Sequence, residues 1–253
     1  MLKCNKFQMK DKYTFEDLVK LTQVLRGPGG CPWDAEQTHK SIKRNFLEEV
    51  YEAVEAIDAG NIELLKEELG DVLAQVVFHA QIEAELNNFN IDDVADGVCK
   101  KFIYRHPHVF SDVECENSQQ VLKAWDELKR VEKGQKSQTE SLNSVARSLP
   151  SLWRADKLLA KASKAGLDYM SVNPCLDVYD NKNSGDNIEK TIGDMLFYVV
   201  YLARQNGLDP EFCLHSACEK FIENFSRVEE EAKHKGKSIS DMSIEEIENK
   251  WNK

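Results

Sequence analysis

The segment FLEEVYEAVEAIDAG, residues 46–60, and the pentapeptide EELGD, residues 67–71, carry the pattern that decides the fold. Apolar residues recur in the first segment at the spacing of one helical face, and Gly60 then ends the pattern. We predict a helix over Ser41–Ala59 whose core-facing apolar stripe is Leu47, Val50, Tyr51, Val54 and Ile57. The same helix contains four closely spaced carboxylates, and the next helix has a similar cluster in EELGD. Glu49 and Glu52 lie roughly opposite the apolar stripe.

Helical periodicity also dominates the sequence on either side. A cap-like Thr14 and Asp17 open a helix that Gly27 closes, and Asn61 can cap the helix that contains EELGD. RGPGGCPWD, residues 26–34, is predicted to be a loop. Strand-like alternation is nearly absent, so the predicted fold class is all-α, with further helices over 91–104 and 119–133.

Composition narrows the class of function. The 253-residue chain has a formal charge of −11, which argues against a nucleic-acid polymer as partner. Its longest apolar run, VLAQVVFHA at 72–80, is too short for a membrane span, and the first residues lack the apolar core of a secretory signal. The seven cysteines stand singly, as reduced thiols of a cytosol do. We therefore expect a cytoplasmic protein without a membrane partner.

The chain repeats itself. Aligning Asp71 with Asp194 gives six identities in the eleven positions 70–80, and CKKF at 99–102 matches CEKF at 218–221 in the same order. We predict two tandem related helical units, with 1–132 as the first, 133–141 as a polar linker and 142–253 as the second. Pairing of such units would give a four-helix-bundle-like arrangement.

The acidic pairs predict a cation site. Glu49 and Glu52 are three residues apart, as are Glu68 and Asp71, so each pair can converge beside its own helix. The short connection at Gly60 makes the two helices antiparallel neighbours, which lets the pairs face each other. Four carboxylates suit Mg²⁺, or Mn²⁺ as an alternative, and suit zinc poorly. The competing interpretation is a solvated acidic face.

The sequence resembles the MazG-type nucleoside triphosphate pyrophosphohydrolases. Six segments carry the resemblance in order along the chain: GCPWDAEQTHKSI (30–42), FLEEVYE (46–52), EELGDVLAQVVFHAQ (67–81), KKFIYRHPHVF (100–110), ENSQQVLKAWDELK (116–129) and RSLPSLWRADKL (147–158). The family signature E-E-x-x-E is present at 48–52, and E-x-x-D follows at 68–71. The similarity covers nearly the whole chain and is closest in its N-terminal half.

The resemblance implies a helical bundle that forms a homodimer and hydrolyses nucleoside triphosphates to monophosphate and pyrophosphate, a nucleotide-pool housekeeping reaction. It implies Mg²⁺ ligation by Glu49, Glu52, Glu68 and Asp71, and it makes Glu48 the candidate to orient or deprotonate the attacking water. It further implies that Lys101 and Arg105 offset phosphate charge. Trp33 either stacks on a base or belongs to the core.

The second unit departs from the family pattern. The positions that correspond to Glu48, Glu49, Glu52 and Glu68 are occupied by Asp180, Asn181, Ser184 and Thr191, and only Asp194 keeps a carboxylate. Asn224 stands where Arg105 would be, although Lys220 remains. We expect this unit to be catalytically inactive and to have a structural role or to form part of a dimer interface.

Three hypotheses follow from the sequence. The first is an active Mg²⁺-dependent pyrophosphohydrolase that uses the first unit. The second is a catalytically degenerate protein that binds nucleotides or a protein partner, motivated by the eroded second unit. The third is a purely structural helical protein, which gives no reason for clustering five carboxylates at positions 48, 49, 52, 68 and 71.

Overall fold

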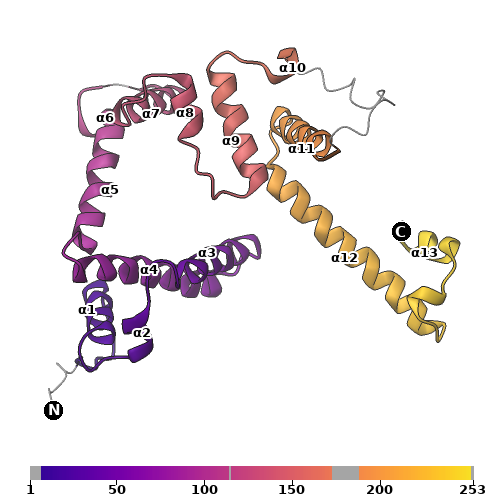
Figure 1. Ribbon diagram of the computed structural model, residues 1–253, viewed down its shortest axis with the longest axis horizontal. Coiled ribbons are helices and arrows are strands. Elements are labelled where there is room, and N and C mark those ends of the chain that lie inside the picture. Colours follow the sequence, from indigo (N-terminus) through magenta and orange to yellow (C-terminus); the bar gives the residue numbers. More distant parts are fainter. Residues whose placement is uncertain (1–6, 114, 173–187, 252–253) are drawn as a thin grey trace. The chain divides into compact units, whose positions relative to one another are not determined.

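The computed structural model describes residues 7–113, 115–172 and 188–251, and every regular element in those ranges is helical (Figure 1). The predicted all-α class is therefore confirmed. Contacts divide the chain into two compact units, Met1–Leu128 and Lys129–Lys253, called unit 1 and unit 2 below. No helix in the described residues is long and apolar enough to cross a lipid bilayer.

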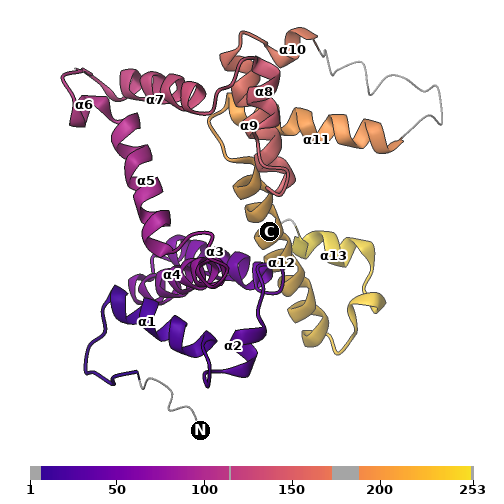
Figure 2. The ribbon, with the colours of Figure 1, turned by 60° about the vertical axis from the view of Figure 1, so that its left-hand side comes forward.

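Unit 1 is built around two antiparallel helices, α3 and α4. Helix α3 lies alongside α4, and α5 leaves the far end of α4 in a different direction (Figures 1 and 2). Helices α1 and α5 both pack on α4, while α2 packs on α1 and α6 on α5. The bounds are α1 (Phe15–Arg26), α2 (Pro32–Glu36), α3 (Lys43–Asp58), α4 (Ile62–Glu85), α5 (Ile91–Arg105), α6 (Pro107–Phe110) and α7 (Ser118–Glu132), which continues into unit 2.

Local signals in the sequence set the ends of these helices. Thr14 and Asp17 form a capping box at the start of α1, as predicted. Between α3 and α4, Gly60 has a φ of 62°, and its N–H donates to the carbonyl of Ile57. The N–H of Asn61 donates to the carbonyl of Ala56, which completes a Schellman motif. The turn that makes α3 and α4 antiparallel is therefore encoded locally.

The packed face of α3 differs from the prediction. Ala53 and Ala56 are its buried residues, and the predicted core stripe is 39–58% exposed at Leu47, Val50, Tyr51, Val54 and Ile57. Alanine side chains let two helices approach closely, so α3 meets α4 through its small residues and the larger apolar side chains point away. On α4, Val77, Ala80 and Ile82 are buried.

Two segments predicted to lack regular structure contain short helices. Within the predicted loop 26–34, α2 begins at Pro32, a residue whose fixed φ suits the first turn of a helix. Within the predicted linker 133–141, the Ser137 hydroxyl accepts from the N–H of Glu140, and α8 begins at Gln138. The linker is thus helical over its last four residues.

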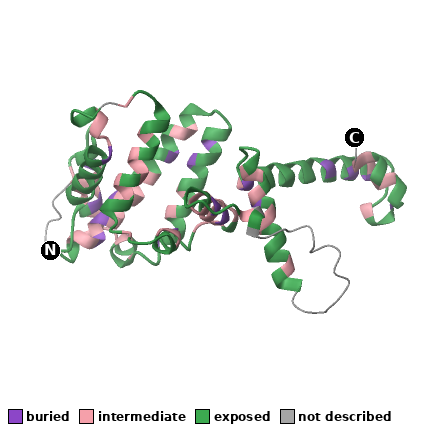
Figure 3. Cartoon of the chain, turned by 90° about the horizontal axis from the view of Figure 1, so that it is seen from above, coloured by how far each residue is buried: buried purple, intermediate pink, exposed green. Residues whose placement is uncertain are grey.

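Unit 2 holds two small cores in its described residues. Ala155, Leu159 and Val200 form one of them, where α9 meets α11. Val228, Ala232 and Met242 form the other, near the end of α12. Exposed residues dominate both units, and buried residues occur in short stretches (Figure 3). The bounds are α8 (Gln138–Asn143), α9 (Ser151–Lys164), α10 (Tyr169–Val172), α11 (Ile188–Gln205), α12 (Pro210–His234), η2 (Ile239–Asp241) and α13 (Ile244–Trp251).

Candidate metal centre

Three carboxylates converge between α3 and α4. Glu49 projects from α3, and Glu68 and Asp71 project from α4, with one ligand oxygen of each lying within 4.8 Å of the other two. Glu68 is only 9% exposed, which is unusual for a glutamate. Among the described residues, no other group of three His, Cys, Asp or Glu side chains is arranged to hold a metal ion.

The electrostatics of the cluster favour a bound cation. Partial burial, followed by the charge of Asp71, raises the pKa of Glu49 above its usual value. Burial also raises the pKa of Glu68, with the charges of Glu52 and Asp71 next in importance. Both shifts mean that the ionised carboxylates repel one another and are poorly solvated. A divalent cation would relieve this repulsion, so the donor set fits a hard metal ion with oxygen ligands.

Two further residues border the three carboxylates. Glu52 lies on α3 next to Glu49, and its charge contributes to the raised pKa of both Glu49 and Glu68. Gln75 lies one turn after Asp71 on α4, and its side chain forms a hydrogen bond with Glu49 that works against the upward shift of the Glu49 pKa. Sequence reasoning missed Gln75, although its spacing of four residues from Asp71 places it on the same face of the helix.

The remaining predicted site residues lie in other surroundings. Glu48 accepts a 2.8 Å hydrogen bond from Nε of Arg44, one turn earlier on α3. Trp33 is 60% exposed on α2, which excludes the core alternative for this residue. Lys101 is exposed on α5, whereas Arg105 is 6% exposed, with its guanidinium carbon 5.1 Å from the ring centre of Trp125. These four residues are not part of the carboxylate group.

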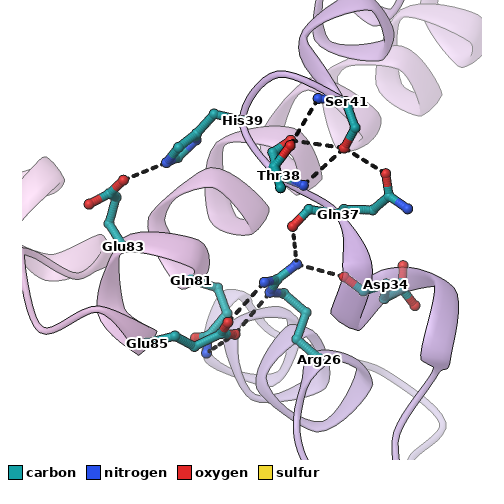
Figure 4. A network of polar contacts seen from close by, with 9 residues as sticks. All are labelled: Arg26, Asp34, Gln37, Thr38, His39, Ser41, Gln81, Glu83 and Glu85. Atoms are coloured by element: carbon teal, nitrogen blue, oxygen red, sulfur yellow. Dashed lines mark hydrogen bonds and ion pairs between the residues drawn. The ribbon is translucent and has the colours of Figure 1, made fainter.

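The side chain of Arg26, which is 4% exposed, ties α1 and the α2 segment to α4. Nε and Nη2 of Arg26 donate to the two carboxylate oxygens of Glu85 at 2.9 and 2.8 Å (Figure 4). Its Nη1 donates to the main-chain carbonyls of Asp34 and Gln37 at 2.6 and 3.2 Å. The guanidinium also lies 5.0 Å from the ring centre of Phe78. Sequence reasoning missed this clamp, because Glu85 lies 59 residues from Arg26 along the chain.

Helix α11 of unit 2, which aligns with α4, has fewer carboxylates than α4. Asp194 lies exposed on α11, with Thr191 one turn before it. The other three counterparts, at 180, 181 and 184, fall outside the described residues. Asn224, the counterpart of Arg105, is buried on α12 and accepts a hydrogen bond from Nη2 of Arg227.

Comparisons with known protein sequences identify the relatives of this chain. The sequence model of the MazG nucleotide pyrophosphohydrolase domain matches residues 37–110, which include α3, α4 and α5. A protein of Thermotoga maritima named nucleoside triphosphate pyrophosphohydrolase/pyrophosphatase MazG is 39% identical over 94% of this chain and 94% of its own length.

Two other relatives extend the comparison. The Escherichia coli nucleoside triphosphate pyrophosphohydrolase is 37% identical over 92% of this chain and 94% of its own length. The Bacillus subtilis protein YabN is 39% identical over 95% of this chain, which corresponds to 51% of YabN. With this degree of identity over nearly its whole length, the chain belongs to the MazG family of nucleotide pyrophosphohydrolases.

Proposed function

We propose that this protein hydrolyses nucleoside triphosphates to nucleoside monophosphate and pyrophosphate at a magnesium site in unit 1. The observation that carries the proposal is the convergence of Glu49, Glu68 and Asp71, two of which have raised pKa values. A cluster of this kind lowers stability unless it holds a cation. The names of the relatives in Thermotoga maritima and Escherichia coli support the same reaction.

The carboxylates would hold the ion and, through it, the substrate. Glu49, Glu68 and Asp71 offer convergent oxygens, and we assign Glu52, which borders them on α3, as the fourth ligand. A bound Mg²⁺, or Mn²⁺ in its place, would polarise the phosphate oxygens and lower the pKa of the attacking water. Because three or four carboxylates outweigh the +2 charge of the ion, further cations near the phosphates would help to bind a triphosphate.

Other residues would act on the water and the phosphates. Glu48 precedes Glu49 directly, and its hydrogen bond to Arg44 orients its carboxylate, so we assign it the role of orienting or deprotonating the water. Lys101 and Arg105 lie four residues apart on α5 and are the basic residues assigned to the phosphates. Lys101 is exposed for this role, whereas Arg105 would have to leave its buried position over Trp125. Trp33 is exposed and free to stack on a base.

The exposed face of α3 supports a homodimer. Its five apolar side chains, which the α3–α4 contact leaves 39–58% exposed, form a helical stripe of the kind that pairs with another helix. Pairing of α3 and α4 from two copies would give a four-helix bundle. In this proposal unit 2 is inactive and contributes structure or dimerising surface, and a nucleotide-pool role would place the protein in the cytoplasm.

The test is pyrophosphate release from a panel of canonical and modified nucleoside triphosphates, with and without Mg²⁺. We expect Mg²⁺-dependent turnover that Glu52→Gln abolishes and Asp194→Asn leaves unchanged. Loss of turnover with Asp194→Asn alone would place the chemistry in unit 2. Nucleotide binding without turnover in the wild-type protein would instead support a degenerate binding protein.

A further inference from the structure

A tight turn over residues 38–41 connects α2 to α3. The N–H of Thr38 donates to the Ser41 hydroxyl at 2.9 Å, and the N–H of Ser41 donates to the Thr38 carbonyl at 3.1 Å, so the turn is closed by its own hydrogen bonds. The polar contacts from this turn to α4 both come from His39, whose ring points to Glu83 (Figure 4). The polar attachment of the turn to α4 therefore depends on one histidine side chain.

His39 meets His79 of α4 edge to edge. The two ring planes differ by 7°, the ring centres are 5.0 Å apart, and the Nδ1 atoms are 2.7 Å apart. The distance between the centres exceeds the distance between the Nδ1 atoms by about the width of one imidazole ring, so the two Nδ1 atoms point at each other. This geometry is that of an N–H···N hydrogen bond, in which one Nδ1 carries a proton and the other carries none.

The opposite edge of the His39 ring is bound by a carboxylate. Nε2 of His39 lies 2.5 Å from one oxygen of Glu83, and Asn88 donates to the other oxygen at 2.6 Å. The hydrogen bonds from Asn88 and His39 lower the pKa of Glu83, so the carboxylate is ionised and accepts from Nε2 of His39. His39 can then also be protonated at Nδ1 only while Nδ1 of His79 has no proton. The hydrogen-bonded pair can therefore hold one positive charge but not two.

The surroundings of the pair disfavour a second positive charge. Both histidines line a pocket whose other lining residues are apolar except Lys43: Phe46 from α3, Val76 and Ala80 from α4, Phe89, and Val94 from α5. The charged groups placed at the pair are thus Glu83 and Lys43, while the cation of α1, Arg26, is bound to Glu85. Burial, followed by the charge of His39, lowers the pKa of His79.

We propose that the His39–His79 pair is a pH-sensitive latch, which holds the turn 38–41 on α4 at neutral pH and releases it in acid, when both rings are protonated. Two protonated Nδ1 atoms cannot share a hydrogen bond, and two imidazolium rings at this distance repel each other. Histidine is the side chain whose charge changes in the range where such a contact would respond. The latch is separate from the proposed reaction, because neither histidine belongs to the carboxylate group.

The experiment measures amide hydrogen exchange of the turn in the full-length protein at pH 7.5 and pH 5, with each rate divided by its intrinsic rate at that pH. The N–H groups of Ser41 and Ile42 donate within the turn and should lose protection when the turn leaves α4. His79→Gln keeps a polar side chain on α4 that cannot become charged. His234→Gln is the matched control, because His234 is exposed in the last turn of α12, in unit 2.

We expect the protection of these amides to fall about fivefold or more between pH 7.5 and pH 5 in the wild type and in His234→Gln, since one unit of pKa difference corresponds to a factor of ten. His79→Gln should show no such fall, and the amides of α4 should stay protected in all three proteins. In NMR titrations of the wild type, His39 and His79 should titrate as a coupled pair in two steps, the lower one below the usual value of 6.5.

Several results would overturn the proposal. One is an equal fall of protection in the wild type and in His79→Gln, and another is no fall in the wild type. Loss of protection throughout α4 would also overturn it, because acid would then unfold unit 1 as a whole. If His79→Gln does not fold, the NMR titration of the wild type decides: two coupled steps support the latch, and two independent titrations at the usual value refute it.

Discussion

Replacing Glu49 by glutamine should remove most of the stabilisation that Mg²⁺ gives to unit 1. A ligand at 100 times its Kd stabilises a folded protein by about 2.7 kcal/mol. Even the loss of a residue that merely supports a metal ligand weakens binding about 10- to 100-fold, so loss of a ligand should reach the upper end. At a 100-fold weaker Kd, the same Mg²⁺ concentration stabilises by only about 0.4 kcal/mol.

The effect is large enough to measure by thermal unfolding. For a unit of this size, about 3 to 4 °C per kcal/mol predicts a rise in Tm of roughly 8 to 11 °C for the wild type and 1 to 2 °C for Glu49→Gln. Without Mg²⁺, the variant should melt above the wild type, because burial and Asp71 disfavour the charged form of Glu49.

A matched control lies on the neighbouring helix. Glu63→Gln also removes one carboxylate, but Glu63 is exposed and pairs with Lys66 on the surface of α4. It should keep the full Mg²⁺ response. If Glu49→Gln and Glu63→Gln respond to Mg²⁺ as the wild type does, the three convergent carboxylates are a solvated acidic face and the reasoning from their geometry is refuted.

Three further outcomes concern the scaffold. The pKa of His79 is lowered by burial and by His39, so neutral His79 stabilises the fold above pH 6.5, and this contribution is lost as the pH falls through the lowered pKa. His79→Gln should therefore make the free energy of urea unfolding depend less on pH between pH 7.5 and 5.5. An unchanged pH dependence would contradict this. Arg26→Ala should cost about 2 kcal/mol by urea unfolding, less than a fully buried pair, because the Glu85 side chain is 37% exposed; a loss near zero would refute the clamp. Gly30→Ala should lower the free energy of unfolding by about 3 kcal/mol, since its Cβ would lie 2.2 Å from the Val24 carbonyl oxygen. The Cβ of Gly97→Ala would meet no atom within 4 Å, so this variant should stabilise α5 by about 0.5 to 1 kcal/mol. Equal melting temperatures for the two variants would show that the α1–α2 loop is not tightly packed.

Elements with local signals could be predicted from the sequence. The capping box at Thr14, the turn at Gly60 and the cap at Asn61 each depend on residues within one helical turn. The face of α3 that packs on α4 could not be predicted in the same way. Hydrophobic periodicity identifies the largest apolar residues, but close packing of two helices is decided by small residues such as Ala53 and Ala56.

The features of the candidate site also differ in whether local sequence signals could predict them. The i, i+3 spacing of Glu68 and Asp71, with the short turn after α3, was enough to predict that carboxylates of the two helices converge. Contacts between distant parts of the chain could not be predicted from the sequence. The His39–His79 pair joins residues 40 positions apart, and no local pattern signals it. The exposure of Trp33 likewise depends on how α2 packs, which the sequence does not encode within one turn.

In the α2 segment, Arg26 binds main-chain atoms and no side chain. Two of its hydrogen bonds end on the main-chain carbonyls of Asp34 and Gln37, which any amino acid would offer. Substitutions at these two positions should therefore drift freely as the gene diverges, while insertions and deletions between Gly27 and Gln37 should be eliminated. In an evolutionary record of this chain, the length of the segment would stay fixed while the residues at positions 34 and 37 changed.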